Sequence, residues 1–347
     1  MATPDSLTAW RQFVDHAPIE PERLSPKELK ALNPEEKNAY DRERFAWLAA
    51  DTVLETTDTQ ALARQARIAL ARNAATTATA RRGLAVSGAA GTGKSTAALL
   101  IGKRHEKAER RRLGRTDDTT FAPVVYTVVP PATTPRMLMQ AFANWLGLPV
   151  PQRATAQMVT ERVVGVIRTL GVSLVILDEV HNLTTSRLAG AEAASTLKQF
   201  ADRLDATFLY AGIDLPETDL FAGDMGRQIK ARMIVHRMRP YGIGSTADRE
   251  AWTELVLGVE DLLPLAAHVP ESLAGQAAYL WDRTGGSIGA LRALLSDAAI
   301  GAIIDGTEKI DRPRLEATAT DYAAEEHHHT RAVQPAGPRK RGLKRAQ

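Results

Sequence analysis

The chain has 347 residues, 44% of them hydrophobic, so it is long enough for about two globular domains with a substantial core. It contains no cysteine, which excludes disulfide bonds and thiolate metal sites. Residues 1–20 lack the apolar core of a signal peptide, and no apolar run approaches the length that spans a bilayer. We therefore expect a cytoplasmic protein without a membrane partner.

Residues 1–75 are polar and rich in helical patterns, and we expect them to form a helical N-terminal region. Pro21, Pro26 and Pro34 separate short helices, because proline ends or begins a helix more easily than it continues one. The longest expected helix in this region covers residues 35–50.

Residues 76–245 alternate between short apolar runs and helical patterns. The expected strands are Leu84–Ser87, Val124–Val129, Leu174–Leu177, Phe208–Ala211 and Ile234–Met238. The expected helices lie near 94–112, 135–147, 156–170 and 190–204. Such alternation predicts an α/β fold, in which a parallel sheet is covered by helices on both faces.

Residues Gly88–Thr96 read Gly-Ala-Ala-Gly-Thr-Gly-Lys-Ser-Thr, which has the spacing of a phosphate-binding P-loop. The glycines let the backbone turn tightly and aim N–H groups at phosphate oxygens, and the helix that begins here points its positive end at them. Lys94 adds a catalytic cation for the β- and γ-phosphates, and the Ser95 hydroxyl is placed to coordinate Mg²⁺. The sequence therefore predicts an ATP site made by Gly88, Ala89, Ala90, Gly91, Thr92, Gly93, Lys94, Ser95 and Thr96.

The helix after the P-loop ends in a basic run, Lys103–Arg115, with seven cations and two glutamates. Repeated along an oligomer, such a run can follow the phosphate backbone of duplex DNA without reading its bases. The alternative is a solvated helix end, where cations complement the negative end of the helix dipole. The candidate DNA contacts are Lys103, Arg104, Lys107, Arg110 and Arg111.

The third expected strand ends in two carboxylates, Asp178 and Glu179. A buried strand that ends at the carboxyl edge of the sheet presents Asp178 beside the P-loop, where it can hold Mg²⁺ and help to bind the nucleotide. Glu179 is then the natural general base for a water that attacks the γ-phosphate. The two motifs together indicate a P-loop NTPase that hydrolyses its nucleotide.

Residues 246–325 show helical patterns throughout and predict a small all-α lid domain. We expect residues 326–347 to form a disordered tail, because they are rich in proline and glycine. From residue 331 onward this tail contains six cations and no acidic residue. The tail either attracts nucleic acid or an acidic partner, or only keeps the protein soluble. Three consecutive side chains, His327–His329, do not converge on one ion, so we expect no metal site there.

The order of P-loop, Asp-Glu strand end, further strand, arginine and helical lid resembles that of AAA+ ATPases. Within that class the chain is similar to the transposition regulators of the TniB and TnsC type. The similarity covers about residues 35–310 and rests on five local phrases, which are Tyr40–Arg44, Asp178–Leu183, Ala211–Pro216, Gln228–Met233 and Thr284–Arg292.

The resemblance implies roles for further residues. Arg232 corresponds to the arginine finger that reaches the nucleotide of a neighbouring subunit, with Arg227, Arg237 and Arg239 as nearby competitors. Arg292 lies about one turn from the position of the family's lid arginine, near Gly289, and is a further nucleotide contact. Ile213 stands where relatives often have threonine, so the sequence leaves open which polar group orients the attacking water.

The resemblance also implies a function. We expect a slow, switch-like ATPase that forms a ring or a helical filament on duplex DNA and recruits a transposase, together with a target-selection protein. Two alternatives stay open, namely a signalling or defence ATPase that acts on a protein partner without DNA, and an AAA+ factor of the helicase-loader type.

Overall fold

The computed structural model describes residues 3–50, 54–76, 81–184, 187–215 and 230–319. The chain divides into two compact units, and it passes between them more than once. One unit combines Met1–Ile19 with Ala50–Arg239, and the other combines Glu20–Ala49 with Pro240–Gln347. The residues expected as one N-terminal region, 1–75, are therefore shared between the two units.

The first unit is built on a parallel sheet of five strands in the order β2-β3-β4-β1-β5. The strands are β1 (Gly83–Ser87), β2 (Val124–Val128), β3 (Leu174–Asp178), β4 (Thr207–Gly212) and β5 (Met233–Arg237). Every residue of β1, β3 and β4 is buried, as expected for central parallel strands covered on both faces. The predicted α/β fold is confirmed, with strand ends within two residues of the expected ones.

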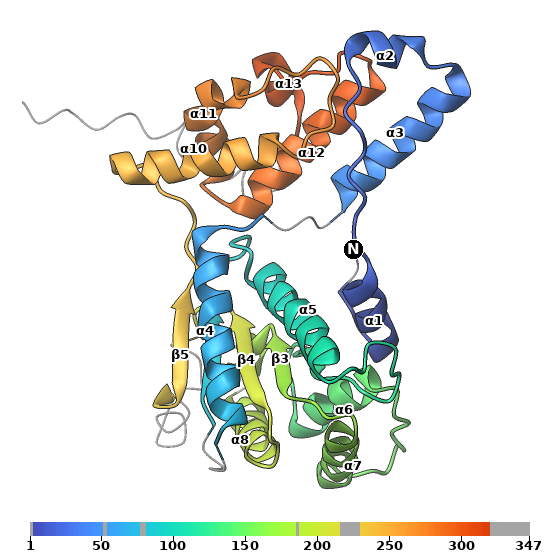
Figure 1. Cartoon of the computed structure of the whole chain (residues 1–347). Helices are drawn as coiled ribbons and strands as arrows, with labels where there is room; N and C mark the ends of the chain where they lie inside the picture. Colours follow the sequence, from blue (N-terminus) through green and yellow to red (C-terminus); the bar gives the residue numbers. More distant parts are fainter. Residues whose placement is uncertain (1–2, 51–53, 77–80, 185–186, 216–229, 320–347) are drawn as a thin grey trace, which may run out of the picture. The chain divides into compact units, whose positions relative to one another are not determined.

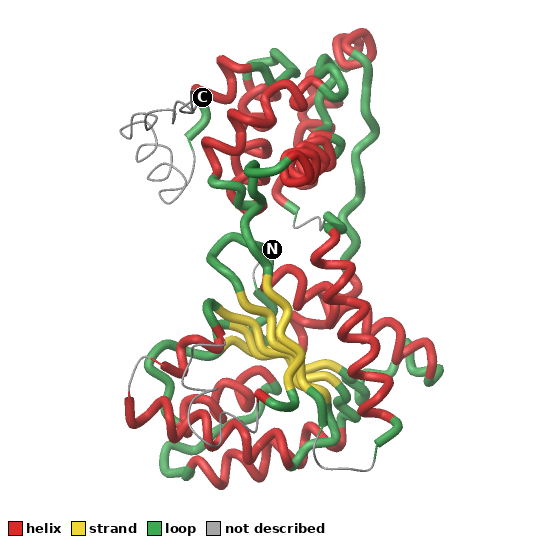
Figure 2. The backbone as a smooth tube through the Cα atoms, turned by 90° about the vertical axis from the view of Figure 1, so that its left-hand side faces the viewer, coloured by secondary structure: helices red, strands yellow, loops and turns green. Residues whose placement is uncertain are grey.

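Helices cover both faces of this sheet (Figures 1 and 2). Two of them, α4 (Thr57–Ala74) and α5 (Lys94–Arg112), pack on one face, and α1 (Leu7–Asp15) packs on α5. The other face carries α6 (Pro135–Trp145), α7 (Ala156–Thr169) and α8 (Arg187–Asp202). Right-handed crossovers explain why the connecting helices lie on different faces. The chain runs outward from β1 to β2 and then returns through β3 and β4, and connections that run in opposite directions place their helices on opposite faces of the sheet.

The described residues of the second unit form helices and connecting loops, without a strand. Its helices are α2 (Pro26–Ala31), α3 (Pro34–Ala49), α10 (Thr246–Glu260), η4 (Ser272–Gln276), α11 (Ala277–Thr284), α12 (Ile288–Ile304) and α13 (Arg312–Ala317). Helix α12 lies in the core of the unit, and Leu291, Leu294 and Leu295 are at most 1% exposed. The all-α pattern predicted for 246–325 is found up to Ala317, and α2 and α3 join it.

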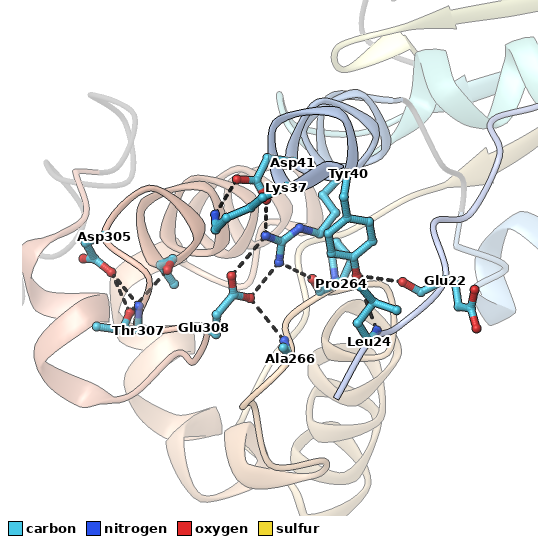
Figure 3. A network of polar contacts seen from close by, with 12 residues as sticks. Glu22, Leu24, Lys37, Tyr40, Asp41, Pro264, Ala266, Asp305, Thr307 and Glu308 are labelled. Carbon is cyan, nitrogen blue, oxygen red and sulfur yellow. Dashed lines mark hydrogen bonds and ion pairs between the residues drawn. The ribbon is translucent and has the colours of Figure 1, made fainter. Parts of the chain in front are cut away.

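A buried ion pair attaches α3 to this unit. The Arg44 guanidinium, fully buried, donates to Glu308 Oε2 at 2.6 Å and to Pro264 O at 3.2 Å, and it also binds Asp41. Figure 3 shows Asp41, Pro264 and Glu308 gathered around one guanidinium group. Burial alone lowers the pKa of Arg44, but its bonds to Glu308 and Asp41 outweigh this effect and raise it.

Among the described residues, no single helix is both long and apolar enough to cross a membrane. One pair of helices, Ser272–Thr284 and Ile288–Ile304, meets the length and composition criteria only when joined across a bend of 116°.

Candidate nucleotide-binding site

The predicted P-loop connects the carboxyl end of β1 to the first turn of α5. Gly91 and Gly93 have φ angles of 72° and 85°, a left-handed conformation that glycine adopts without strain. A Cβ atom at Gly88 would lie 2.2 Å from the carbonyl oxygen of Met238, so only glycine fits there. The loop therefore has the backbone that a phosphate-binding nest requires.

Lys94 lies in the first turn of α5 and is 7% exposed. Its ammonium donates to the carbonyl oxygen of Ala89 at 2.6 Å, and the Thr92 hydroxyl donates to the same oxygen at 2.8 Å. Burial lowers the pKa of Lys94, while the charges of Asp178, Glu179 and Asp214 oppose that shift. The lysine is thus in the electrostatic field of the carboxylates at the ends of β3 and β4.

The remaining loop residues lie toward solvent. Ala89 and Ala90 are exposed, and Ser95 in the first turn of α5 is half-buried, whereas the following Thr96 is exposed. Ser95 therefore follows the nest directly and is partly accessible, as a magnesium ligand must be.

Asp178 ends β3 and is 2% exposed. Both of its carboxylate oxygens are held, because the Tyr126 hydroxyl donates to Oδ2 at 2.9 Å and the Glu179 N–H donates to Oδ1 at 2.8 Å. Burial raises the pKa of Tyr126, and the charge of Asp178 raises it further, so the phenol stays protonated and remains a donor. The geometry fixes the orientation of the carboxylate.

Glu179 follows directly and has a φ angle of 56°, which is unusual for a residue with a side chain. Its side chain is 44% exposed, and Oε2 lies 3.3 Å from Nε2 of His181. The strands β1 and β3 flank β4 in parallel, so their carboxyl ends lie about 10 Å apart at one edge of the sheet. The P-loop and the Asp-Glu pair thus share that edge, as predicted.

The segment after β4 connects these two motifs. The Gly88 N–H donates to Gly212 O at 3.4 Å, and the Leu215 N–H donates to the Ser87 hydroxyl at 3.1 Å. On the other side, the Ile213 N–H donates to Nδ1 of His181 at 3.3 Å. The segment therefore contacts both the P-loop strand and the residues after Glu179.

The donor set fits magnesium bound together with a nucleotide. In the described part of the chain, no group of three or more His, Asp or Glu side chains could hold a metal ion alone. Mg²⁺ often binds through only one or two protein ligands, with phosphate oxygens and water completing its octahedron. Ser95 and the oriented Asp178 are ligands of that kind.

Arg232 lies far from the P-loop of its own chain. Its carbonyl oxygen accepts from the Gly83 N–H at 3.1 Å, at the amino edge of the sheet. Its side chain is 43% exposed, and its guanidinium lies 3.9 Å from the Asp202 carboxylate, at the end of α8. Arg292 belongs to α12 in the second unit, and its predicted contact with the nucleotide stays a prediction.

The five candidate DNA contacts on α5 differ in their accessibility. Lys103 donates to the carbonyl oxygens of Phe13 and His16, at the end of α1. Arg110 is 11% exposed, and it binds Glu106 and four backbone carbonyls of residues 115–121. Both side chains are structural in this chain. Arg104 pairs with Glu55. Lys107 and Arg111 are exposed.

Sequence reasoning missed two residues of the site, Tyr126 and His181. A signal for Tyr126 was present, since it is the aromatic hydroxyl within the apolar run Val124–Val129 and had to find a partner. His181 gave no comparable signal, because its contacts depend on the loop after β4. Several residues named in the sequence analysis lie outside the described part of the chain, namely Arg227, Gln228, Ile229, His327–His329 and the basic tail.

Comparison with known proteins identifies the family. The model of the bacterial TniB protein family matches residues 44–241, more than half of the chain. A comparison with curated proteins finds no match.

Solved structures share the fold. ORC1 of Aeropyrum pernix, determined in complex with DNA, has a TM-score of 0.59 and 20% identity, over 81% of this chain and 68% of that chain. ORC2 of Aeropyrum pernix, determined as ADPNP–ADP complexes, has a TM-score of 0.59 and 16% identity, over 81% and 73%. Cdc6p of Pyrobaculum aerophilum has a TM-score of 0.51 and 16% identity, over 76% and 67%. The chain therefore belongs to the bacterial TniB family and has the fold of an AAA+ P-loop ATPase.

Proposed function

We propose that this protein is an ATP-hydrolysing switch of DNA transposition, which assembles on duplex DNA when ATP is bound. The observation that carries the proposal is the shared sheet edge, where the nest before Lys94 meets the oriented Asp178 and the accessible Glu179. A lysine, a hydroxyl, a fixed aspartate and an accessible glutamate are the parts that phosphoryl transfer requires.

Binding of ATP would rearrange contacts within the loop. The Lys94 ammonium now donates to Ala89 O, and a phosphate oxygen is a stronger acceptor than a carbonyl. The ammonium would therefore move to the β- and γ-phosphates, while the loop N–H groups and the start of α5 face the same oxygens. Mg²⁺ held by Ser95 and Asp178 would neutralise the charge that develops on the phosphates.

Hydrolysis would use Glu179 as the base. A water oxygen attacks the γ-phosphorus, its proton passes to the Glu179 carboxylate, and the bond from that phosphorus to the oxygen of ADP breaks. The 44% exposure of the Glu179 side chain leaves space for a water beside it. Turnover of this kind supports a switch, since hydrolysis removes the phosphate that holds the assembled state.

The position of Arg232 supports assembly. It precedes β5 at the amino edge of the sheet, whereas the P-loop follows β1 at the carboxyl edge. A strand of five residues is about 16 Å long, so the guanidinium does not reach the nucleotide of its own chain. It can reach a nucleotide on a neighbouring subunit, and such a head-to-tail contact builds a ring or a helical filament.

Two observations support duplex DNA as a partner. The family is TniB, and its resemblance to transposition regulators implies contacts with a transposase and a target-selection protein. The exposed cations Lys107 and Arg111 lie near the end of α5, where repetition along a filament would give a continuous basic track. We place this assembly in the cytoplasm.

A gel shift with duplex DNA tests the proposal. We expect ATP to increase binding at about 150 mM salt, and Lys94→Ala to remove the increase together with nucleotide binding. Glu179→Gln should retain ATP and trap the DNA-bound form. Equal DNA binding with and without ATP would instead favour an ATPase that acts on a protein partner, and loading of a helicase onto DNA would favour the loader function.

A further inference from the structure

In the loop after β4, described up to Leu215, Ile213 offers no polar side chain that could read the state of the nucleotide. Ile213 is apolar and Asp214, with a φ angle of 46°, is exposed. The backbone of Ile213 nevertheless makes a polar contact in the site, because its N–H donates to Nδ1 of His181 at 3.3 Å. The side chain that receives this contact belongs to the segment after Glu179.

The second nitrogen of the same ring faces the proposed base. Nε2 of His181 lies 3.3 Å from Oε2 of Glu179. Since Nδ1 accepts the Ile213 N–H, it presents its lone pair, and the proton of the neutral ring is on Nε2. With that proton, Nε2 can donate to the Glu179 carboxylate oxygen 3.3 Å away while Nδ1 accepts from the loop.

The packing around the ring keeps these contacts short. A Cβ atom at Gly212 would lie 3.3 Å from Nδ1 of His181, 3.2 Å from its backbone nitrogen and 2.7 Å from Leu215 Cδ2. Glycine at this position thus lets β4 approach the ring. The same Gly212 accepts from the Gly88 N–H at 3.4 Å, so the backbone that touches His181 also touches the start of the P-loop.

We propose that His181 is a positioning residue for ATP hydrolysis, which holds the Glu179 carboxylate and couples it to the P-loop through the backbone of Gly212 and Ile213. The proposal rests on the proposed ATPase function. The Ile213 side chain has no polar group that could orient the attacking water, and His181 takes this orienting role instead. A change at the P-loop would shift the loop after β4, and His181 would transmit that shift to the base.

Steady-state kinetics with two substitutions tests this coupling. His181→Phe keeps a ring but removes both nitrogens, and we expect kcat to fall by about tenfold or more while the Kd for ATP changes less than about threefold. His181→Gln retains one acceptor and one donor, so it should recover part of the loss. An unchanged or increased kcat in His181→Phe, or no recovery in His181→Gln, would overturn the proposal.

The matched control is His105→Phe. His105 lies on α5 of the same unit, and its Nε2 is 2.8 Å from the Ser173 hydroxyl, away from the Asp-Glu pair. The same substitution there should leave kcat within about twofold of the wild type. A comparable loss in both variants would show that His181→Phe acts through general destabilisation, and it would overturn the positioning role.

A spectroscopic readout separates this inference from the proposed function. The ¹⁵N shifts of His181 should report a proton on Nε2 and none on Nδ1, and the Ile213 amide signal should move in His181→Phe. If the wild type hydrolyses no ATP, the proposed function fails and these shifts still decide the contact. If Glu179→Gln abolishes turnover and His181→Phe leaves kcat unchanged, the inference alone fails.

Discussion

The Tyr126 hydroxyl donates a hydrogen bond of 2.9 Å to Oδ2 of Asp178, and both side chains are buried. This contact joins β2 to the proposed magnesium ligand on β3 and leaves the carboxylate one orientation. The Trp10 ring of α1 stacks on the Tyr126 ring, with the ring centroids 6.3 Å apart, and Nε1 of Trp10 donates to the buried Glu106 of α5. The carboxylate is thus supported by three packed elements.

We expect Tyr126→Phe to weaken magnesium-dependent ATP binding by about tenfold, because a hydrogen bond to a charged group contributes about 1.5–3 kcal/mol. ATP affinity measured with EDTA should be unaffected, since no ion is then held. A fluorescent ATP analogue titrated with and without Mg²⁺ gives both values.

The control is Tyr210→Phe on β4, the strand on the other side of β3, where the tyrosine is buried and removal of the hydroxyl leaves Asp178 untouched. Equal losses in the two variants, or a loss that persists in EDTA, would contradict a specific role for Tyr126.

Arg232 should act on the site of a neighbouring subunit. Arg232→Ala is expected to bind ATP normally and to hydrolyse it at least about tenfold more slowly. Mixed with Glu179→Gln, itself inactive, it should regain activity, because the glutamine variant donates the arginine to sites with an intact base. In a random mixture of the two variants, about a quarter of the subunit interfaces combine an intact Glu179 with an intact Arg232 from the neighbour. The ATPase rate of the mixture is the measurement, and no gain over the separate variants would place Arg232 outside the site.

DNA binding should depend on the accessible cations of α5. We expect the double change of Lys107 and Arg111 to Glu to weaken duplex binding and to reduce its dependence on salt, because each lost phosphate contact releases about one counterion fewer. Arg153→Glu, in the exposed turn before α7, is a control that reverses one charge outside α5, and its loss is compared with half of the loss in the double variant. Fluorescence anisotropy over a salt series measures both. A similar loss in the Arg153 variant would indicate attraction by net charge alone.

Much of the fold and the site follows from local sequence. The apolar runs, the glycines at 91 and 93 and the Asp-Glu pair act within a few residues, so their strands, turn and shared edge could be predicted. Contacts between distant segments could not. Arg44 and Glu308 are 264 positions apart, and their pairing explains why α3 joins the second unit. Counting charges along α5 likewise gave no indication that Lys103 and Arg110 bind backbone carbonyls.

The Arg44–Glu308 pair should be important for stability. Glu308→Ala leaves a buried guanidinium with only part of its partners, and we expect a loss of about 3 kcal/mol in the free energy of unfolding. Lys309→Ala breaks a pair whose side chains are 55% and 45% exposed, and it should cost no more than about 0.5 kcal/mol. Urea unfolding of both variants provides the comparison. Equal losses in the free energy of unfolding would contradict the conclusion that the buried pair stabilises the fold more than the exposed pair does.

Low pH should destabilise the loop after α5 because Asp118 becomes protonated. The Thr120 hydroxyl and N–H and the Arg115 guanidinium bind its carboxylate, and they lower its pKa from 3.8 to about 2. Because the folded pKa lies below the unfolded one, the carboxylate stabilises the fold fully above about pH 4, and this contribution disappears as the pH falls toward 2. Asp118→Asn should therefore be less stable than the wild type at about pH 5, and the difference should shrink at about pH 3. Urea midpoints at the two pH values measure it, and a constant difference would mean that the carboxylate charge is not responsible.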